Sequence, residues 1–266
     1  MTRLAFLTDL HFGYERHELR GALITAVNAT QPDLVVCAGD LAHRARRGLL
    51  SAGRRLLDEL DAPWFVVPGN HDVPLYNVVA RMARPFHDYR RILGRDLEFV
   101  TLVGDICVIG ANTTDPYKWQ RGALSHRQID RICTLAQPEA AAGRRVILAV
   151  HHPLEQHPEV DKDLAVNAAE AMARFEDSGV HVVLSGHLHH WYTDYFIDRG
   201  DCRVLQVQGG TALCDRTTDL QNEFATLDLE GCNLAVRRYV ARGEALTFAP
   251  RDPINLTRID GIWRRR

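Results

Sequence analysis

Short apolar runs recur along the first two-thirds of the chain, and each one ends in a polar segment. They cover residues 4–8, 34–38, 64–67, 146–150 and 181–185. The runs are continuous rather than alternating, as expected for strands that are buried on both faces between helices. The pattern therefore predicts buried strands that alternate with helices over this part of the chain.

Between these runs, apolar residues are spaced as on one face of a helix. Such faces are predicted over residues 18–28, 48–60 and 165–175. Ser125 and Gln128 have the spacing of a capping box, which predicts that a further helix begins there. Together with the apolar runs, these helices indicate repeated strand–helix–strand units.

The C-terminal third has a different pattern, because its apolar runs are separated by short turns. They cover residues 192–197, 203–207, 223–229 and 234–240. This spacing predicts mainly antiparallel strands. No repeat or linker divides the chain, so we expect one domain over residues 1–266, with two sheets and outer helices.

Composition narrows the class of protein. The 266 residues carry 32 Lys and Arg against 34 Asp and Glu, a net charge of −2, which argues against a stable nucleic-acid partner. The six cysteines are scattered without a C-x-x-C pair; their even number leaves disulfides open, but in a chain with enough core we expect isolated cysteines within apolar runs to be small buried residues. Without an apolar stretch of about 20 residues or a secretory leader, we expect a cytoplasmic protein with no transmembrane segment.

Polar clusters stand at the ends of five predicted strands. Loops at the carboxyl ends of strands in an open α/β sheet converge on one crevice, so we expect these clusters to meet. They are Asp9-Leu10-His11, Gly39-Asp40, Gly69-Asn70-His71-Asp72, His151-His152 and Gly186-His187-Leu188-His189.

The clusters are rich in oxygen and imidazole donors, which suit Mn, Fe or Zn, and we expect no thiolate among them. Seven donors are too many for one ion that keeps an open position. They suit two divalent or trivalent transition-metal ions that share one carboxylate. The predicted metal ligands are Asp9, His11, Asp40, Asn70, His151, His187 and His189.

Two metal ions close together favour displacement at phosphorus, with a water bridging the ions as the attacking hydroxide. The leaving oxygen then needs a proton, and we assign this role to His71, beside Asn70. Asp72 is the candidate to orient the His71 imidazole. Asn70 and His71 are also expected to contact the substrate phosphate.

The order D-x-H, G-D, G-N-H-D, H-H-P, G-H-x-H resembles the calcineurin-like metallophosphoesterase superfamily. The resemblance implies a four-layer α/β/β/α sandwich of two mixed β-sheets flanked by helices. It also implies a ligand set for each metal: Asp9, His11 and His189 for the first, Asn70, His151 and His187 for the second, with Asp40 bridging.

Within that superfamily, the Gly-Asp-Leu-Ala and Val-Pro-Gly-Asn-His-Asp segments resemble bacterial class III cyclic-nucleotide phosphodiesterases. The implied substrate is a small phosphodiester such as a 3',5'-cyclic nucleotide. His43 and Pro68 depart from the protein-phosphatase pattern and disfavour that branch. His43 and Arg44 follow the bridging carboxylate closely, and His152 follows His151, so these three are candidate substrate contacts.

Other functions stay open. The same two-metal site is compatible with a phosphomonoesterase or a nuclease that acts on short ends. A non-catalytic scaffold of the same fold is a third possibility, although all seven donors and His71 are present. A homodimer is possible through the C-terminal strands.

Overall fold

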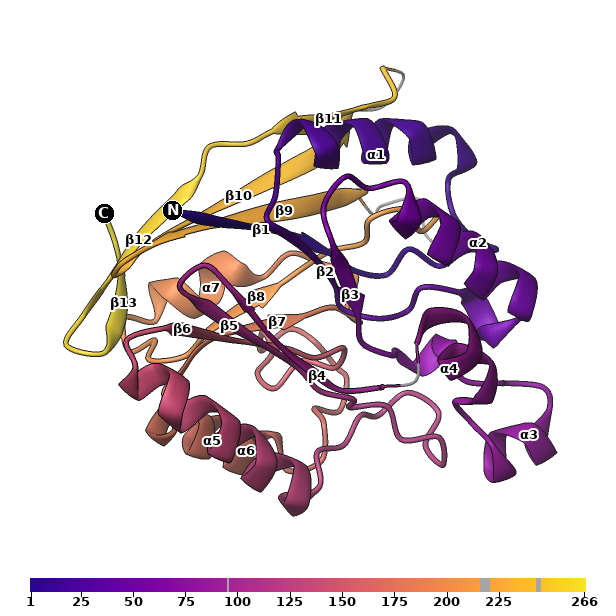
Figure 1. Cartoon of the computed structure of the whole chain (residues 1–266), viewed down its shortest axis with the longest axis horizontal. Coiled ribbons are helices and arrows are strands. Elements are labelled where there is room, and N and C mark those ends of the chain that lie inside the picture. The colour runs from indigo at the N-terminus through magenta and orange to yellow at the C-terminus, as the bar shows by residue number, and fades with distance from the viewer. Residues whose placement is uncertain (95, 216–220, 243–244) are drawn as a thin grey trace.

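The computed structural model describes residues 1–94, 96–215, 221–242 and 245–266. Within them, two mixed β-sheets pack face to face, and helices cover the outer face of each (Figure 1). This arrangement confirms the predicted four-layer α/β/β/α sandwich.

The first sheet has the order β13-β12-β10-β9-β1-β2-β3, and β11 pairs with β10. β1 pairs in parallel with β2 and antiparallel with β9. The strands are β1 (Thr2–Leu7), β2 (Leu34–Cys37), β3 (Trp64–Val66), β9 (Glu223–Glu230), β10 (Asn233–Arg242), β11 (Thr247–Pro250), β12 (Ile254–Ile259) and β13 (Ile262–Arg265).

The second sheet has the order β4-β5-β6-β7-β8. Its strands from β5 to β8 are parallel, and β4 is antiparallel to β5. The strands are β4 (Phe99–Val103), β5 (Ile106–Gly110), β6 (Arg145–Ala149), β7 (Val180–Ser185) and β8 (Leu205–Gln208).

Helices separate most of the parallel strands. Ser125 caps α5 through the predicted capping box with Gln128. The helices are α1 (Arg20–Ala29), α2 (Arg47–Asp58), α3 (Val78–Ala83), α4 (His87–Leu93), α5 (His126–Ala141), α6 (Ala168–Asp177) and α7 (Thr193–Asp198), with short 3-10 helices at His17–Leu19, His43–Ala45 and Asn70–Asp72.

Successive side chains along each strand point to opposite faces of its sheet, and this divides the core into layers. Leu4 and Phe6 of β1 point into the space between the sheets, whereas Ala5 and Leu7 face α1 and α2. In the second sheet, Leu148 of β6 lies on the outer face, in the hydrophobic cluster that includes residues of α5 and α6. The strands are thus buried on both faces, which explains why their sequence runs are continuous rather than alternating.

Residues 192–197 are predicted to be a strand, but residues 193–197 belong to helix α7 and Tyr192 caps it. The segment is rich in residues common in strands, but its buried positions are Thr193, Phe196 and Ile197, a spacing that fits a helix. Residues 203–207 do contribute a strand, β8, but it is parallel to β7 and belongs to the second sheet. The runs at 223–229 and 234–240 form the predicted antiparallel pair, β9 and β10.

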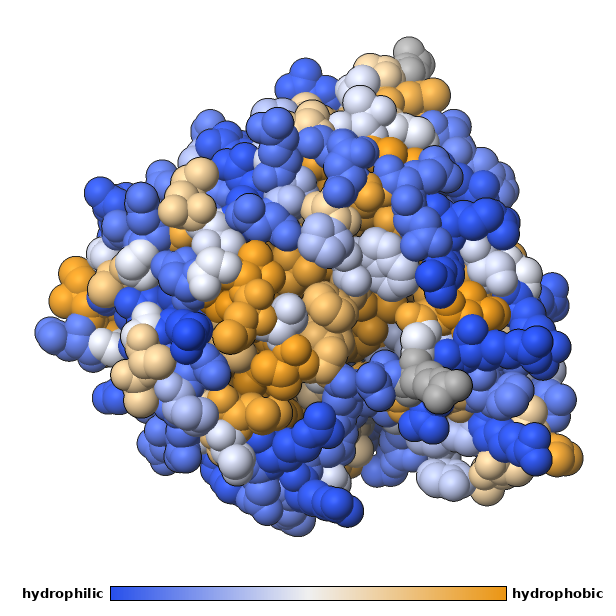
Figure 2. Space-filling model, viewed as in Figure 1, coloured by the Kyte–Doolittle hydropathy of each residue, from blue (hydrophilic) through white to orange (hydrophobic). Residues whose placement is uncertain are grey.

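The face drawn in Figure 2 carries apolar residues in its middle and polar residues around them. β3 and β4 are edge strands of the two sheets, and Val100 and Leu102 of β4 are 43% and 51% exposed. Among the described residues, none of the helices has the length and apolar character that crossing a membrane requires.

The homodimer and the single domain over residues 1–266 remain predictions.

Candidate active site

The five polar clusters follow β1, β2, β3, β6 and β7, and the fold brings them together. Backbone hydrogen bonds join neighbouring loops: Asp9 N donates to Gly39 O at 3.1 Å, and His11 N donates to Asp40 O at 2.9 Å. Gly186 N donates to His151 O at 3.0 Å. The convergence expected from strand ends is therefore present.

One group of donors contains Asp9, His11 and His189. Oδ1 of Asp9 lies 3.4 Å from Nε2 of His11 and 3.0 Å from Nε2 of His189. The two imidazole nitrogens are 3.0 Å apart. Nε2 of His11 is also 3.5 Å from Oδ2 of Asp40.

The second group contains Asn70, His151 and His187. Oδ1 of Asn70 lies 3.1 Å from Nε2 of His151 and 3.0 Å from Nδ1 of His187. Nε2 of His151 is 3.4 Å from Oδ2 of Asp40. A single carboxylate oxygen of Asp40 therefore adjoins both groups.

These separations fit metal coordination. Ligands that lie about 2.1 Å from a common ion and roughly 90–109° apart are separated by about 3.0–3.4 Å. The seven donor–donor distances given above for the two groups and Asp40 run from 3.0 to 3.5 Å. The side chains present therefore fit two ions that share Asp40.

The backbone is strained at most of these donors. Asp9, His11, Asp40, His187 and His189 all have a positive φ, between 50° and 72°. This left-handed conformation costs roughly 1 kcal/mol or more for a residue with a side chain, and such strain concentrates at functional sites. The fold therefore holds these five side chains in place at the expense of local backbone energy.

Burial alone would raise the pKa of Asp9 and Asp40, but neighbouring imidazoles hold both values well below the usual range. Burial alone would lower the pKa of His189 and His151, but Asp9 raises the first to about 10 and Asp40 raises the second to about 9. The carboxylates are thus anionic within a buried cluster, as a cation site requires.

A family model for the calcineurin-like phosphoesterases matches residues 2–191, which cover all five clusters. The chain belongs to this family. It is therefore a hydrolytic phosphoesterase, which confirms the enzyme class that the motifs predict, and a two-metal centre is the arrangement that this family implies.

Individual relatives agree with this assignment. The phosphoesterase is 26% identical over 209 residues to a probable cyclic nucleotide phosphodiesterase of Pseudoalteromonas sp. (strain SM9913), covering 73% of this chain and 74% of the relative. Glycerophosphodiester phosphodiesterase GpdQ of Enterobacter lignolyticus (strain SCF1) is 34% identical over 80 residues, 26% of this chain and 29% of the relative. The fold resembles a dimetal phosphatase from Danio rerio, with a TM-score of 0.65, 14% identity and coverage of 96% of this chain and 98% of that one.

His71 lies beside Asp40 and the first donor group of the phosphoesterase. Its backbone N donates to Oδ1 of Asp40 at 2.7 Å, and its ring stacks on His43 with centroids 4.9 Å apart. The ring also approaches His11 edge-on, at 4.9 Å. Because the side chain is only partly buried, it is placed where a substrate can reach it.

Asp72 joins two of the loops through their backbone. Its carboxylate accepts hydrogen bonds from the N–H groups of Leu41 at 3.2 Å, Ala42 at 3.0 Å and Gly69 at 2.9 Å. Burial, reinforced by the charge of Asp40, raises the pKa of Asp72 to about 7. Asp72 therefore positions the loops that carry Asp40 and Asn70, and its expected contact with the His71 ring stays a prediction.

The expected substrate contacts lie at different depths. His43 is buried between His71 and Tyr14, whose ring centroid is 4.3 Å away. Arg44 is half-buried, and its guanidinium lies 4.7 Å from the ring centroid of Tyr76. Arg44 is therefore better placed than His43 for direct contact with a substrate.

His152 is only 2% exposed and lies behind the donors. Its Nδ1 is 2.9 Å from Oγ1 of Thr113, and its ring is 4.7 Å from that of His187. Burial and the charge of His187 hold the pKa of His152 well below its usual value, so the ring is neutral. Within the described residues this position suits support of His187, and direct substrate contact by His152 stays a prediction.

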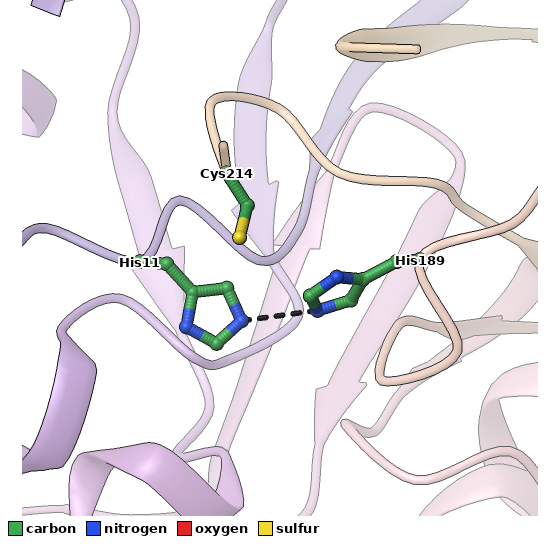
Figure 3. Close-up of side chains that lie close together, drawn as sticks. All are labelled: His11, His189 and Cys214. Atoms are coloured by element: carbon green, nitrogen blue, oxygen red, sulfur yellow. Dashed lines mark hydrogen bonds between the residues drawn. The ribbon is translucent and has the colours of Figure 1, made fainter. Parts of the chain in front are cut away.

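The structure places a sulfur beside the first donor group, and the expectation that no thiolate joins the ligands stays a prediction. Figure 3 shows that the Cys214 side chain points toward His11 and His189. Ligand atoms of these three residues lie within 4.8 Å of one another, and Cys214 is only 2% exposed. Cys214 follows β8, outside the five motifs, and no metal-ligand spacing in its sequence neighbourhood gives a sign of this proximity.

Proposed function

We propose that this phosphoesterase hydrolyses small phosphodiesters, with 3',5'-cyclic nucleotides as the first substrates to test, at a centre of two transition-metal ions. The supporting observation is the position of Oδ2 of Asp40, 3.5 Å from Nε2 of His11 and 3.4 Å from Nε2 of His151. One oxygen in reach of both donor groups is the arrangement that a shared carboxylate ligand requires.

Asp9, His11 and His189 would hold the first ion, Asn70, His151 and His187 the second, and Asp40 both. Ions bound there supply Lewis-acid chemistry, because they lower the pKa of water and offset charge on the phosphoryl oxygens. Mn, Fe and Zn all suit these oxygen and nitrogen donors.

The protein itself supplies the proton that the leaving alcohol needs. The His71 ring lies against the first donor group, held by its backbone bond to Asp40 and by stacking on His43. From this position His71 can donate a proton to the leaving oxygen on the open side of the cluster. Asp72 fixes the position of the loop that carries His71, because its carboxylate accepts three hydrogen bonds from backbone N–H groups.

The cyclic-nucleotide part of the proposal draws on the similarity to the probable cyclic nucleotide phosphodiesterase. A cyclic nucleotide is a compact diester whose phosphate can reach the donors while its base extends to one side. The surroundings of His187, described below, contain space for that side group.

The test combines metal analysis with single-ligand variants. Purified wild-type protein is expected to bind about two Mn²⁺ per chain and to hydrolyse bis(p-nitrophenyl) phosphate faster than p-nitrophenyl phosphate. His189→Ala and His187→Ala should each lose about one ion, whereas Asp40→Ala should lose both and at least a thousandfold in kcat/KM. Retention of both ions by Asp40→Ala would overturn the shared-ligand assignment.

His71 needs a separate test, because a bystander on the loop would also reduce activity when it is replaced. His71→Ala should slow hydrolysis strongly for a poor leaving group such as the ribose hydroxyl of cAMP. The loss should be smaller for p-nitrophenolate, which leaves without a proton. Equal losses for both leaving groups would rule out the proton-donor role, and preference for the monoester would favour the phosphomonoesterase alternative.

A further inference from the structure

A pocket of about 460 Å³ opens beside His187, next to the second donor group. This volume lies within the range of small-molecule sites, roughly 300–1,000 Å³. Two loops form it, residues 118–121 and residues 161–163. Neither belongs to the five motifs, so the pocket is a feature of this chain rather than of the shared donor set.

The loop that carries Trp119 is held by a buried arginine. Arg81 of α3 is 8% exposed and donates to Pro116 O at 2.6 Å, Lys118 O at 2.9 Å and Pro74 O at 3.1 Å. Its guanidinium lies 5.6 Å from the Trp119 ring centroid. These bonds fix the backbone around Trp119, although the indole itself is 71% exposed.

The opposite loop is also anchored. Gln156 Nε2 donates to Val160 O at 3.0 Å and to Lys162 O at 2.6 Å. Arg121 connects the two loops, because its Nε donates to Leu164 O at 2.9 Å and its guanidinium is 3.8 Å from the Asp163 carboxylate. Hydrogen bonds therefore hold both loops of the pocket, and Arg121 connects them.

The lining combines one exposed indole with an excess of positive charge. Lys118, Arg121 and Lys162 contribute three cations, against the two carboxylates of Asp161 and Asp163. An indole face offers stacking to an aromatic ring, and nucleobases bind proteins by such stacking. The cations favour acceptor atoms and negative charge and disfavour a cationic group.

We propose that this pocket takes the base of a nucleotide phosphodiester, stacked on Trp119, while the phosphate lies at the donors beside His187. Lys118 and Lys162 would face acceptor atoms of the base and ribose. The indole alone would accept either a base or a quaternary ammonium, so the excess of positive charge is the feature that would disfavour the cationic alcohol of a phosphocholine diester. This inference rests on the proposed function, since it places the phosphate at the metal centre.

The test measures inhibition of bis(p-nitrophenyl) phosphate hydrolysis by three phosphate compounds: AMP, phosphocholine and inorganic phosphate. Wild-type enzyme loaded with Mn²⁺ should bind AMP at least tenfold more tightly than phosphocholine. Trp119→Ala should weaken inhibition by AMP about tenfold and leave inhibition by inorganic phosphate within twofold. Lys162→Met, which keeps the chain length and removes the charge, should narrow the gap between AMP and phosphocholine.

Tyr117→Ala is the matched control, because Tyr117 is 65% exposed on the same loop but does not line the pocket. It should leave all three inhibition constants unchanged. Equal inhibition by AMP and phosphocholine, or equal effects of Trp119→Ala and Tyr117→Ala, would overturn the proposal that the pocket binds a base. If the wild-type enzyme still hydrolysed the diester, the proposed function would stand. If the enzyme hydrolysed no diester, calorimetric titration with AMP and the same variants would decide on the pocket alone.

Discussion

Gly69→Ala tests how closely the loop of Asn70 must approach the loop of Asp40. A Cβ at position 69 would lie well inside 3.0 Å from both the backbone N and Oδ1 of Asp40. The φ of Gly69 is −101°, which alanine adopts freely, so the substitution acts through contact alone. Because one of the two atoms belongs to the backbone, a side-chain rotation cannot relieve the overlap.

The expected loss of activity and stability follows from the displacement of the Asn70 loop relative to the Asp40 loop. Relief needs a displacement of roughly 1 Å between the loops, and a misplacement of that size can cost about a hundredfold in rate. The shift strains the bonds from His71 N to Asp40 at 2.7 Å and from Gly69 N to Asp72 at 2.9 Å. Each is a hydrogen bond to a carboxylate worth about 1.5–3 kcal/mol, so weakening both lowers the free energy of unfolding by up to about 6 kcal/mol.

The assay pairs kcat/KM for bis(p-nitrophenyl) phosphate with urea unfolding followed by circular dichroism, both in the presence of Mn²⁺. Gly48→Ala is the control: it lies in α2, with nothing within 4 Å of the added Cβ. We expect that control to keep wild-type activity and to change stability by less than about 1 kcal/mol. A Gly69→Ala enzyme within threefold of wild-type kcat/KM and within 1 kcal/mol of its stability would refute the need for this close approach.

Three other predictions concern groups away from this contact. Burial and the charges of Arg258 and Arg145 lower the pKa of His181 to about 4, so folding favours its neutral form and stability falls as pH drops below about 6.5. His181→Asn should therefore remove about 1 kcal/mol of the stability loss between pH 7 and 5.5, measured by urea unfolding; an unchanged pH dependence would contradict the assignment. With Co²⁺ in the centre, the proximity of Cys214 to His11 and His189 predicts a near-ultraviolet sulfur-to-cobalt band, lost in Cys214→Ser and kept in the buried-cysteine control Cys202→Ser. Arg81→Met should weaken inhibition by AMP more than inhibition by inorganic phosphate, because three carbonyls lose their donor; equal effects on both would assign Arg81 a structural role only.

The convergence of the donor loops could be predicted from sequence because each loop follows a short apolar run. A strand end is a local feature, and the convergence of such ends is a general property of α/β sheets. Asp9 and His189 are 180 residues apart, yet their atoms meet at 3.0 Å because β1 and β7 end at the same edge of the sandwich. Local pattern and fold class together therefore predict that these loops meet, and the role of each donor as a ligand stays a prediction.

The rest depends on contacts that leave no local pattern. Arg81 reaches carbonyls 35 and 37 residues away, and backbone acceptors are present in every segment of a sequence. Cys214 looks like any small apolar residue until the fold places it beside His189. Helix α7 was mistaken for a strand because its aromatic and β-branched residues outweighed the helical spacing of Thr193, Phe196 and Ile197.

Backbone strain explains why the site needs such extensive support. Five of the predicted donors adopt a positive φ, which at roughly 1 kcal/mol each amounts to about 5 kcal/mol. That is a large share of the 5–15 kcal/mol by which a typical domain is stable. Thr211 offsets part of it with a bond to Asp9 O at 2.6 Å, and His187 N donates to Oδ2 of Asp9 at 2.9 Å. Each donor loop is thus held by bonds from another loop, so the geometry that suits two ions is built into the folded chain rather than into any one motif.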